Sequence, residues 1–181
     1  MRVIAGTHRG ARIAAPKGLA TRPTGDRVRE AAFNLIGPVD GARVLDLFAG
    51  SGAMGIEALS RGAEAVTFIE SDRSACRTIA ENLERLRLTG ARITCGDALW
   101  ELRRESRSYD LVLVDPPYDL SEQDLGDVLA AVAPALSEHA VVVVERSSRT
   151  PEPTWTPPLE RFDRRAYGET VMWFAELAAA P

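Results

Sequence analysis

Short apolar runs alternate with amphipathic segments from Arg43 onward, and this alternation constrains the fold more than any other feature of the sequence. The runs are rich in Val, Ile and Leu and have the length of buried strands, whereas apolar residues recur at helical spacing within residues 76–86 and 125–136. Strands that alternate with helices in this way form a parallel sheet in an α/β fold. The expected strands are residues 44–48, 65–69, 92–95, 111–114 and 141–144.

The segments on either side fall outside this alternation. Residues 26–36 predict a helix that ends at Gly37 and Pro38, because glycine and proline commonly terminate helices. Residues 151–159 are rich in proline and predict a surface loop, and residues 161–177 predict a closing pair of antiparallel strands. This pair adds an antiparallel end to an otherwise parallel arrangement.

The N-terminal segment differs from the rest of the chain in charge. Of the 22 basic and 26 acidic residues of the chain, residues 1–30 contain seven and two, so an acidic body carries a basic segment. Such a local excess predicts contact with a polyanion, although an ordinary solvated face is the alternative. Two short strand-like runs within residues 2–13 predict a hairpin with His8 and Arg9 at its tip. The side chains expected to contact an RNA backbone are those of Arg2, Arg9, Arg12, Lys17 and Arg22.

Composition excludes several other classes of protein. A chain of 181 residues suits a single domain with a sizeable core, and a hydrophobic content of 45% is ordinary for a globular protein. No apolar run approaches the roughly 18 residues that span a bilayer, and the first ten residues lack the apolar core of an export signal. Cys76 and Cys95 are too few for a disulfide framework and have no metal-ligand spacing around them. We therefore expect a cytoplasmic protein that needs no membrane anchor and no metal.

Gly50, Gly52 and Gly55 follow an expected strand with the spacing of a nucleotide-binding turn, so a dinucleotide-dependent oxidoreductase has to be considered. In such a turn the phosphates lie at a helix N-terminus, where the nearby carboxylate of Asp46 would repel them. S-adenosylmethionine carries an ammonium and a sulfonium and has no phosphate. The acid therefore favours S-adenosylmethionine, with Asp46 bound to the ammonium directly or through water.

Two further acids follow the next two strands. Glu70 ends the second strand, where a carboxylate can accept hydrogen bonds from both ribose hydroxyls of a dinucleotide or of S-adenosylmethionine. Asp97 follows the third strand, where it is placed to accept a hydrogen bond from the adenine amine or, alternatively, to cap a helix. Because ligands of open α/β sheets bind at the carboxyl ends of the strands, these acids predict one binding site.

The most specific stretch of the sequence is Asp115-Pro116-Pro117-Tyr118, directly after an apolar strand. Two prolines fix φ near about −65° and remove two amide donors, which leaves a stiff turn whose carbonyls can accept hydrogen bonds. The carboxylate of Asp115 and the carbonyl of Pro116 can then bind the two hydrogens of one planar NH2 group, while Tyr118 stacks on the ring that bears it. The motif predicts a clamp for a nucleobase with an exocyclic amine.

The segments DLFAGSGAMGIEALSRGA, FIESD and VDPPY together resemble the successive motifs of class I S-adenosylmethionine-dependent methyltransferases that act on exocyclic amines. The N-terminal run RVIAGTHRGARI, the segment TRPTGDRVREAAFNLI and the late YGET are similar to the bacterial RsmD family, over nearly the whole chain. The resemblance implies a Rossmann-like methyltransferase domain in residues 23–181, with helices on both faces of a mostly parallel seven-stranded sheet, after a basic β-hairpin extension in residues 1–22. The expected cofactor site comprises Asp46, Phe48, Gly50, Gly52, Glu70, Ser71, Asp97 and Ala98.

Membership of this family implies N2-methylation of one guanine in 16S ribosomal RNA, recognised within the assembled small subunit, and we expect a monomer. The four residues of the Asp-Pro-Pro-Tyr motif would hold the guanine amine. The sequence departs from the family pattern at Gly25, where a second Thr is more usual, and at the hairpin tip THRG, where an aromatic residue more often precedes Arg-Gly. These departures concern contacts with the substrate more than the chemistry.

Other functions remain open on the sequence alone. An adenine-N6 methyltransferase of DNA or RNA could use the same clamp, because the motif does not distinguish adenine from guanine. A protein amide-nitrogen methyltransferase agrees less well with the basic segment. The alternatives outside this class are a NAD-dependent oxidoreductase and a non-catalytic RNA-binding assembly factor.

Overall fold

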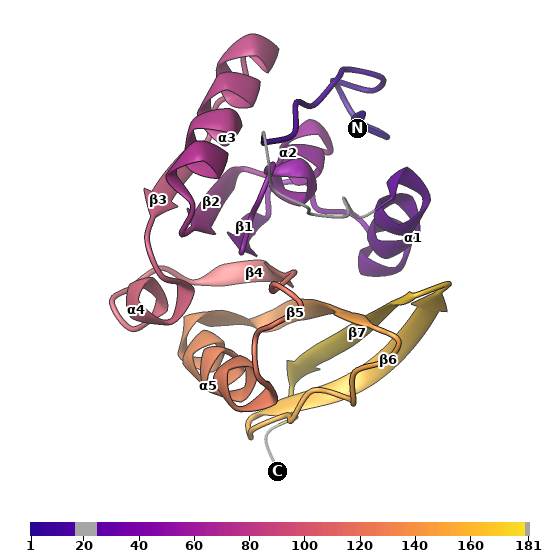
Figure 1. Cartoon of the computed structure of the whole chain (residues 1–181), viewed down its shortest axis with the longest axis vertical. Helices are drawn as coiled ribbons and strands as arrows, with labels where there is room; N and C mark the ends of the chain where they lie inside the picture. Colours follow the sequence, from indigo (N-terminus) through magenta and orange to yellow (C-terminus); the bar gives the residue numbers. More distant parts are fainter. Residues whose placement is uncertain (17–24, 180–181) are drawn as a thin grey trace.

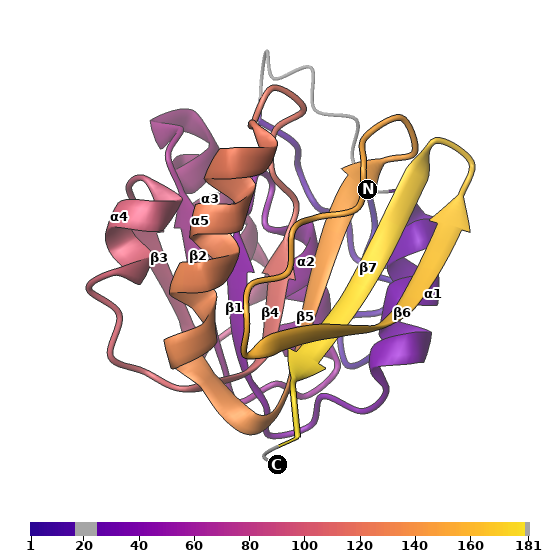
Figure 2. The same ribbon diagram turned by 90° about the horizontal axis from the view of Figure 1, so that it is seen from below.

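Seven strands form one sheet, in the order β3-β2-β1-β4-β5-β7-β6, in the computed structural model, which describes residues 1–16 and 25–179 (Figures 1 and 2). Strands β1 to β5 are parallel to one another, whereas β7 is antiparallel to both β5 and β6. The strand order reverses between β1 and β4, which is where open α/β sheets bind their ligands. The strands are Arg43–Leu47 (β1), Ala65–Glu70 (β2), Ala91–Cys95 (β3), Tyr109–Val114 (β4), Leu136–Ser147 (β5), Leu159–Tyr167 (β6) and Thr170–Leu177 (β7).

Helices cover both faces of this sheet, as Figure 1 shows. One apolar cluster joins α1, α2 and α3 to one face, and a second joins α4 and α5 to the other. Neighbouring residues of β4 alternate between the clusters, with Leu113 in the first and Val114 in the second, because successive strand residues point to opposite faces. Among the described residues, no helix is both long and apolar enough to cross a membrane. The helices are Asp26–Ile36 (α1), Ala53–Ser60 (α2), Arg73–Leu86 (α3), Ala98–Leu102 (α4) and Glu122–Val132 (α5).

The predicted secondary structure is confirmed in most of these elements. The structure has all five predicted parallel strands, the closing antiparallel pair and a helix over the predicted residues 26–36. The prediction of helical structure up to residue 136 was wrong, since α5 ends at Val132 and Leu136 already begins β5. Pro134 explains the difference, because it has no amide hydrogen for a further α-helical turn and the chain forms a 3-10 turn (Ala133–Ala135) instead.

The N-terminal segment reverses direction as the predicted hairpin does, but its two sides are shorter than assigned strands. Residues 1–16 contain a single antiparallel bridge, between Arg2 and Arg12, and no strand is assigned to them. On either side of this bridge the amide of Val3 donates to the carbonyl of Ala11 at 2.9 Å and the amide of Ile13 donates to the carbonyl of Met1 at 3.0 Å, while Gly6 and Gly10, with φ angles of 83° and 81°, turn the chain between the paired segments. The boundary predicted at residue 22 and the candidates Lys17 and Arg22 lie outside the described residues.

Candidate active site

The turn after β1 requires glycine for two different reasons. Gly50 and Gly52 have φ angles of 55° and 75°, which side-chain-bearing residues rarely adopt, and Gly52 is the N-cap of α2. A Cβ atom added at Gly55 would lie 2.3 Å from the ring of Phe68, so this glycine allows α2 to pack closely on β2. Phe48 precedes the turn with a φ of 57°. A positive φ at an aromatic residue marks backbone strain, which is typical of a functional turn.

Asp46 lies beneath this turn and is only 3% exposed. Its Oδ2 accepts a hydrogen bond of 2.9 Å from the amide of Gly55, in the first turn of α2. Burial raises the pKa of Asp46 to about 8, the Gly55 amide opposes this rise and the charge of Glu70 adds to it. A carboxyl group with this pKa releases its proton readily when a cation binds beside it. Since Oδ2 already binds the Gly55 amide, the predicted hydrogen bond from a ligand ammonium would be accepted by the second oxygen, Oδ1.

Glu70 connects the glycine turn to the turn after β2. Its Oε2 accepts a hydrogen bond of 2.8 Å from the amide of Gly50, and its Oε1 accepts one of 2.8 Å from the amide of Asp72. The hydroxyl of Ser71 donates to the same Oε1 at 3.4 Å. The carboxylate is therefore held in one orientation at the end of β2 and retains lone pairs for further hydroxyl donors.

Asp97 and Ala98 begin the short helix α4. Asp97 is the N-cap of this helix, and its Oδ1 accepts a hydrogen bond of 2.8 Å from the amide of Trp100. The structure thus gives Asp97 the capping role that the sequence left open as an alternative. The carboxylate is exposed while Ala98 is buried, so a bond from Asp97 to an adenine amine remains a prediction.

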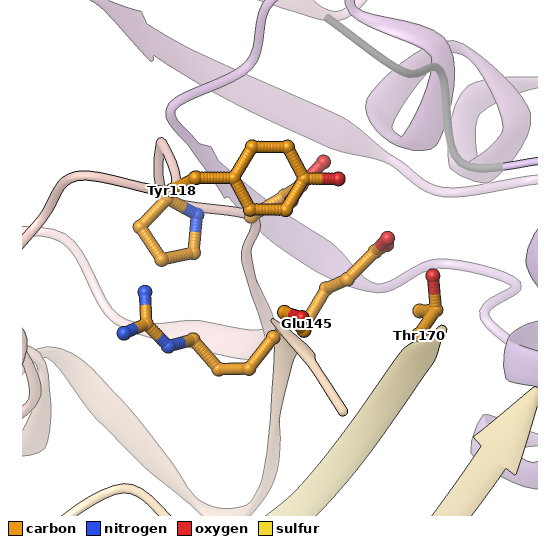
Figure 3. A pocket seen from close by; sticks show the side chains of 7 residues that line it. Tyr118, Glu145 and Thr170 are labelled. Atoms are coloured by element: carbon orange, nitrogen blue, oxygen red, sulfur yellow. The ribbon is translucent and has the colours of Figure 1, made fainter. Parts of the chain in front are cut away.

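Residues 115–118, which we call the diproline loop, form one wall of a small pocket after β4 (Figure 3). The amide of Asp115 lies 3.5 Å from the carbonyl of Leu47, which places this loop beside the end of β1. Pro116 is buried, whereas the ring of Tyr118 is 67% exposed. The residues that line the pocket are Asp115, Pro116, Tyr118, Glu145, Arg146, Ser147 and Thr170.

The sequence analysis missed the wall that β5 and β7 contribute to this pocket. Arg146 is buried, forms an ion pair with Glu122 and donates a hydrogen bond of 3.4 Å to the carbonyl of Leu120. It therefore ties β5 to the segment between the diproline loop and α5. The one signal in the sequence is a charged pair, Glu145 and Arg146, directly after four valines. The described residues contain no group of three or more His, Cys, Asp or Glu that could hold a metal ion.

Comparison with known proteins identifies the family. A family model described as "Conserved hypothetical protein 95" matches residues 1–176. The chain is 43% identical over 119 residues to "Ribosomal RNA small subunit methyltransferase D" of Escherichia coli (strain K12), covering 65% of this chain and 60% of that protein. The Haemophilus influenzae protein of the same name is 34% identical, and the match covers 83% of this chain and 81% of the relative. The chain belongs to the RsmD family.

The similarity extends over the whole RsmD-family chain. YlbH of Bacillus subtilis (strain 168) is 40% identical over 177 residues, which are 94% of this chain and 95% of YlbH. The solved structure of yhhF from Escherichia coli has a TM-score of 0.89 and 31% identity, and the match covers 99% of both chains. The N-terminal segment and the closing strands are therefore part of the shared structure.

A buried charge network holds the N-terminal arm, residues 1–16 of this RsmD-family protein, against α2. Glu57 of α2 is fully buried and accepts hydrogen bonds from the amides of Ile4 and Ala5, at 2.8 and 3.0 Å. The guanidinium groups of Arg61 and Arg29 lie 2.7 and 3.6 Å from the same carboxylate. The arm is thus fixed through its backbone, which leaves its basic side chains available for other contacts.

The basic side chains of the arm are presented to solvent. Arg2, Arg9 and Arg12 are all exposed, although the carbonyl oxygens of Arg2 and Arg12 accept hydrogen bonds from arginines of the body. The end of the arm is held by Asn82 of α3, which exchanges hydrogen bonds of 2.9 and 3.0 Å with the backbone of Ala14. The structure therefore brings three of the five predicted RNA-contacting residues together on one docked segment.

We expect Gly6→Ala to release the tip of the arm from α2. An added Cβ would lie 1.7 Å from the carbonyl oxygen of Ser60, to which the amide of Thr7 donates a hydrogen bond of 2.8 Å. Hydrogen exchange should show loss of protection at the Thr7 amide. Gly10→Ala is the matched control, because Gly10 has a similar φ but an added Cβ meets nothing within 4 Å. Equal protection of Thr7 in both variants would contradict this explanation.

Proposed function

We propose that this RsmD-family protein transfers a methyl group from S-adenosylmethionine to the N2 atom of one guanine in 16S ribosomal RNA, within the assembled small subunit. The observation that carries this proposal is the position of the diproline loop, beside the end of β1 and its glycine turn, where the strand order reverses. An acceptor pair for an NH2 group thus lies next to a turn that suits a cationic nucleoside donor. The relatives named small subunit methyltransferase D support ribosomal RNA as the substrate.

The reaction is a direct in-line displacement. The N2 lone pair of guanine attacks the methyl carbon, the new N–C bond forms as the C–S bond breaks, and the bonding electrons remain on sulfur, so that S-adenosylhomocysteine leaves. The N2 lone pair is delocalised into the ring and is a poor nucleophile unless the amine is oriented and partly rehybridised. Asp115 and the carbonyl of Pro116 do this through hydrogen bonds that strengthen as positive charge develops on nitrogen. The proton leaves N2 after methyl transfer, to Asp115 or to water.

The cofactor residues act by positioning the donor. Asp46 binds the ammonium of S-adenosylmethionine through Oδ1, Glu70 accepts hydrogen bonds from the ribose hydroxyls, and Asp97 accepts one from the adenine amine. Glu70 is suited to this role because amides already orient its carboxylate. Correct placement of two reactants supplies a large part of the acceleration in such reactions, with effective molarities of about 10⁵ M or more.

The RNA is bound by the docked arm and by the exposed tyrosine. Arg2, Arg9 and Arg12 contact phosphates, and their contribution is therefore expected to weaken with increasing salt. The target guanine has to leave its stack to reach the loop, which costs a few kcal/mol. Stacking on Tyr118 offsets about 1–3 kcal/mol of this, since the ring is open to solvent.

We expect Asp46→Asn to abolish a proton release that accompanies cofactor binding. At pH 7 the wild-type carboxyl is mostly protonated, because its pKa is about 8, and a bound ammonium lowers that pKa. Calorimetry with S-adenosylhomocysteine in buffers of different ionisation enthalpy should detect about one proton released per ligand bound. Release of the same size in the variant would show that another group supplies the proton.

The same pKa predicts how stability depends on pH. The folded protein retains the Asp46 proton up to about pH 8, whereas an unperturbed carboxyl releases it near pH 3.8. The contribution of Asp46 to the free energy of unfolding is therefore present below pH 3.8 and is lost as the pH rises toward 8. Urea unfolding of Asp46→Asn should show a smaller decline over this window than the wild type.

Mapping of ribosomal RNA modifications by mass spectrometry tests the proposal. A strain that lacks the gene should lose one N2-methylguanosine from 16S ribosomal RNA, and a plasmid-borne copy should restore it. An unchanged map would remove the proposal. Loss of an N6-methyladenosine instead would favour the adenine-specific alternative.

A further inference from the structure

The pocket behind the diproline loop contains a second carboxylate, on the neighbouring strand. β4 and β5 are parallel, and Val114 lies opposite Val144. Asp115 and Glu145 each come directly after these paired valines, one along each strand. Val114 and Val144 both belong to the apolar cluster under α4 and α5. Because strand residues alternate, Glu145 projects toward the opposite face, into the pocket that Asp115 also lines.

The position of Glu145 suits the edge of a base. Figure 3 shows the side chain of Glu145 between those of Tyr118 and Thr170. The pocket has a volume of about 10 Å³, room for about one water molecule, and is too small to enclose a purine ring. Only the edge of the base reaches the two carboxylates, while the ring remains at the mouth against Tyr118.

Guanine and adenine differ at the atom next to the clamped amine. In guanine the N2 amine adjoins an N1–H donor, whereas in adenine the N6 amine adjoins an N1 lone pair. Neighbouring strands are about 4.8 Å apart, so a purine whose amine is held by Asp115, after β4, can place its N1 beside Glu145 of β5. An ionised carboxylate only accepts hydrogen bonds. It therefore favours the N1–H of guanine and repels the lone pair of adenine.

We propose that Glu145 accepts the N1–H of the target guanine and is the residue by which this pocket selects guanine over adenine. The inference rests on the proposed function, because it assigns a specificity residue to the same site. Asp115 and Pro116 hold the amine that reacts, and Glu145 reads the atom beside it. The two acceptors together match the two adjacent donors of guanine, a pattern that adenine does not present.

The test compares Glu145→Gln with the wild type on two substrates. Small subunits are assembled with 16S ribosomal RNA that carries either guanine or adenine at the nucleotide found by modification mapping, and methyl transfer from labelled S-adenosylmethionine is measured on each. The wild type should methylate the guanine substrate much faster than the adenine substrate, at a rate that is measurable on each. In Glu145→Gln, kcat/KM on guanine should fall by about 10- to 100-fold, as expected for loss of a charge-assisted hydrogen bond. The ratio of guanine to adenine methylation should fall as well, since an amide can donate to the adenine N1.

Two further variants make the result decisive. Glu138→Gln removes the same charge from an exposed position of β5 and should leave both rates unchanged. Glu145→Asp keeps a carboxylate and should keep the preference for guanine even where its rate is lower, which also covers poor folding of the glutamine variant. Equal losses on both substrates in Glu145→Gln, or lost preference in Glu145→Asp, would overturn the inference while guanine methylation stands. Failure of the wild type to methylate either purine would instead overturn the proposed function.

Discussion

Asp115→Ala should reduce methyl transfer by about 10³-fold while leaving the fold and the affinity for S-adenosylhomocysteine unchanged. The loss is large because the variant removes the acceptor that orients the amine and stabilises the positive charge that develops on it. The fold should persist because Asp115 is exposed and lies outside both apolar clusters. Single-turnover rates on small subunits from a strain without the gene, together with calorimetry of S-adenosylhomocysteine binding, measure both effects.

Asp119→Ala is the control for this result. Asp119 is exposed, lies four residues further along the same segment and is not among the residues that line the pocket, so its removal changes the net charge equally. Asp115→Asn retains one acceptor oxygen and should lose less activity than Asp115→Ala. If Asp115→Ala transferred methyl groups at the rate of Asp119→Ala, the clamp would have no part in the chemistry.

The sheet was largely predictable because each of its elements is specified locally. β1, β2 and β4 are strands of five or six mostly apolar residues, and a strand buried on both faces needs little more than such a run. The extent of β5 was not predictable in the same way, since its first residues include Ser137, Glu138 and His139. They extend a strand whose length is set by pairing with β4 and β7, and these partners lie far away in sequence.

The candidate site shows the same division between local and distant information. The glycine turn and the diproline loop are contiguous motifs, so residue types alone indicated their chemistry. Glu145 and Thr170 become part of the pocket only because β5 and β7 pair beside β4. Most contacts that fix the N-terminal arm join residues more than 50 positions apart, such as Ile4 and Glu57. The one indication of these contacts in the local sequence was Glu57, a charged residue within a helix that otherwise contains no charge.

Glu57→Gln should lower the free energy of unfolding by about 3–5 kcal/mol, the usual effect of removing one partner from a buried ion pair. Two guanidinium groups, those of Arg29 and Arg61, would lose the negative charge that they share, and Arg29 is fully buried. The NH2 group that replaces one carboxylate oxygen would also face either the amide of Ile4 or that of Ala5, donor against donor, because the two amides bind different oxygens. Urea unfolding measures the first effect, and hydrogen exchange at these two amides measures the second.

Glu64→Gln is the matched control, because Glu64 follows the same helix but is exposed. The free energy of unfolding of this variant should remain within about 0.5 kcal/mol of the wild-type value. The arm carries the candidate RNA contacts, so Glu57→Gln should also methylate small subunits more slowly at temperatures where its core remains folded. Slow exchange at Ile4 and Ala5 in this variant would contradict the role of Glu57, since no charge would then be needed to hold the arm. Lost protection with unchanged methylation would show instead that docking of the arm is structural, and that the RNA is bound by other surfaces.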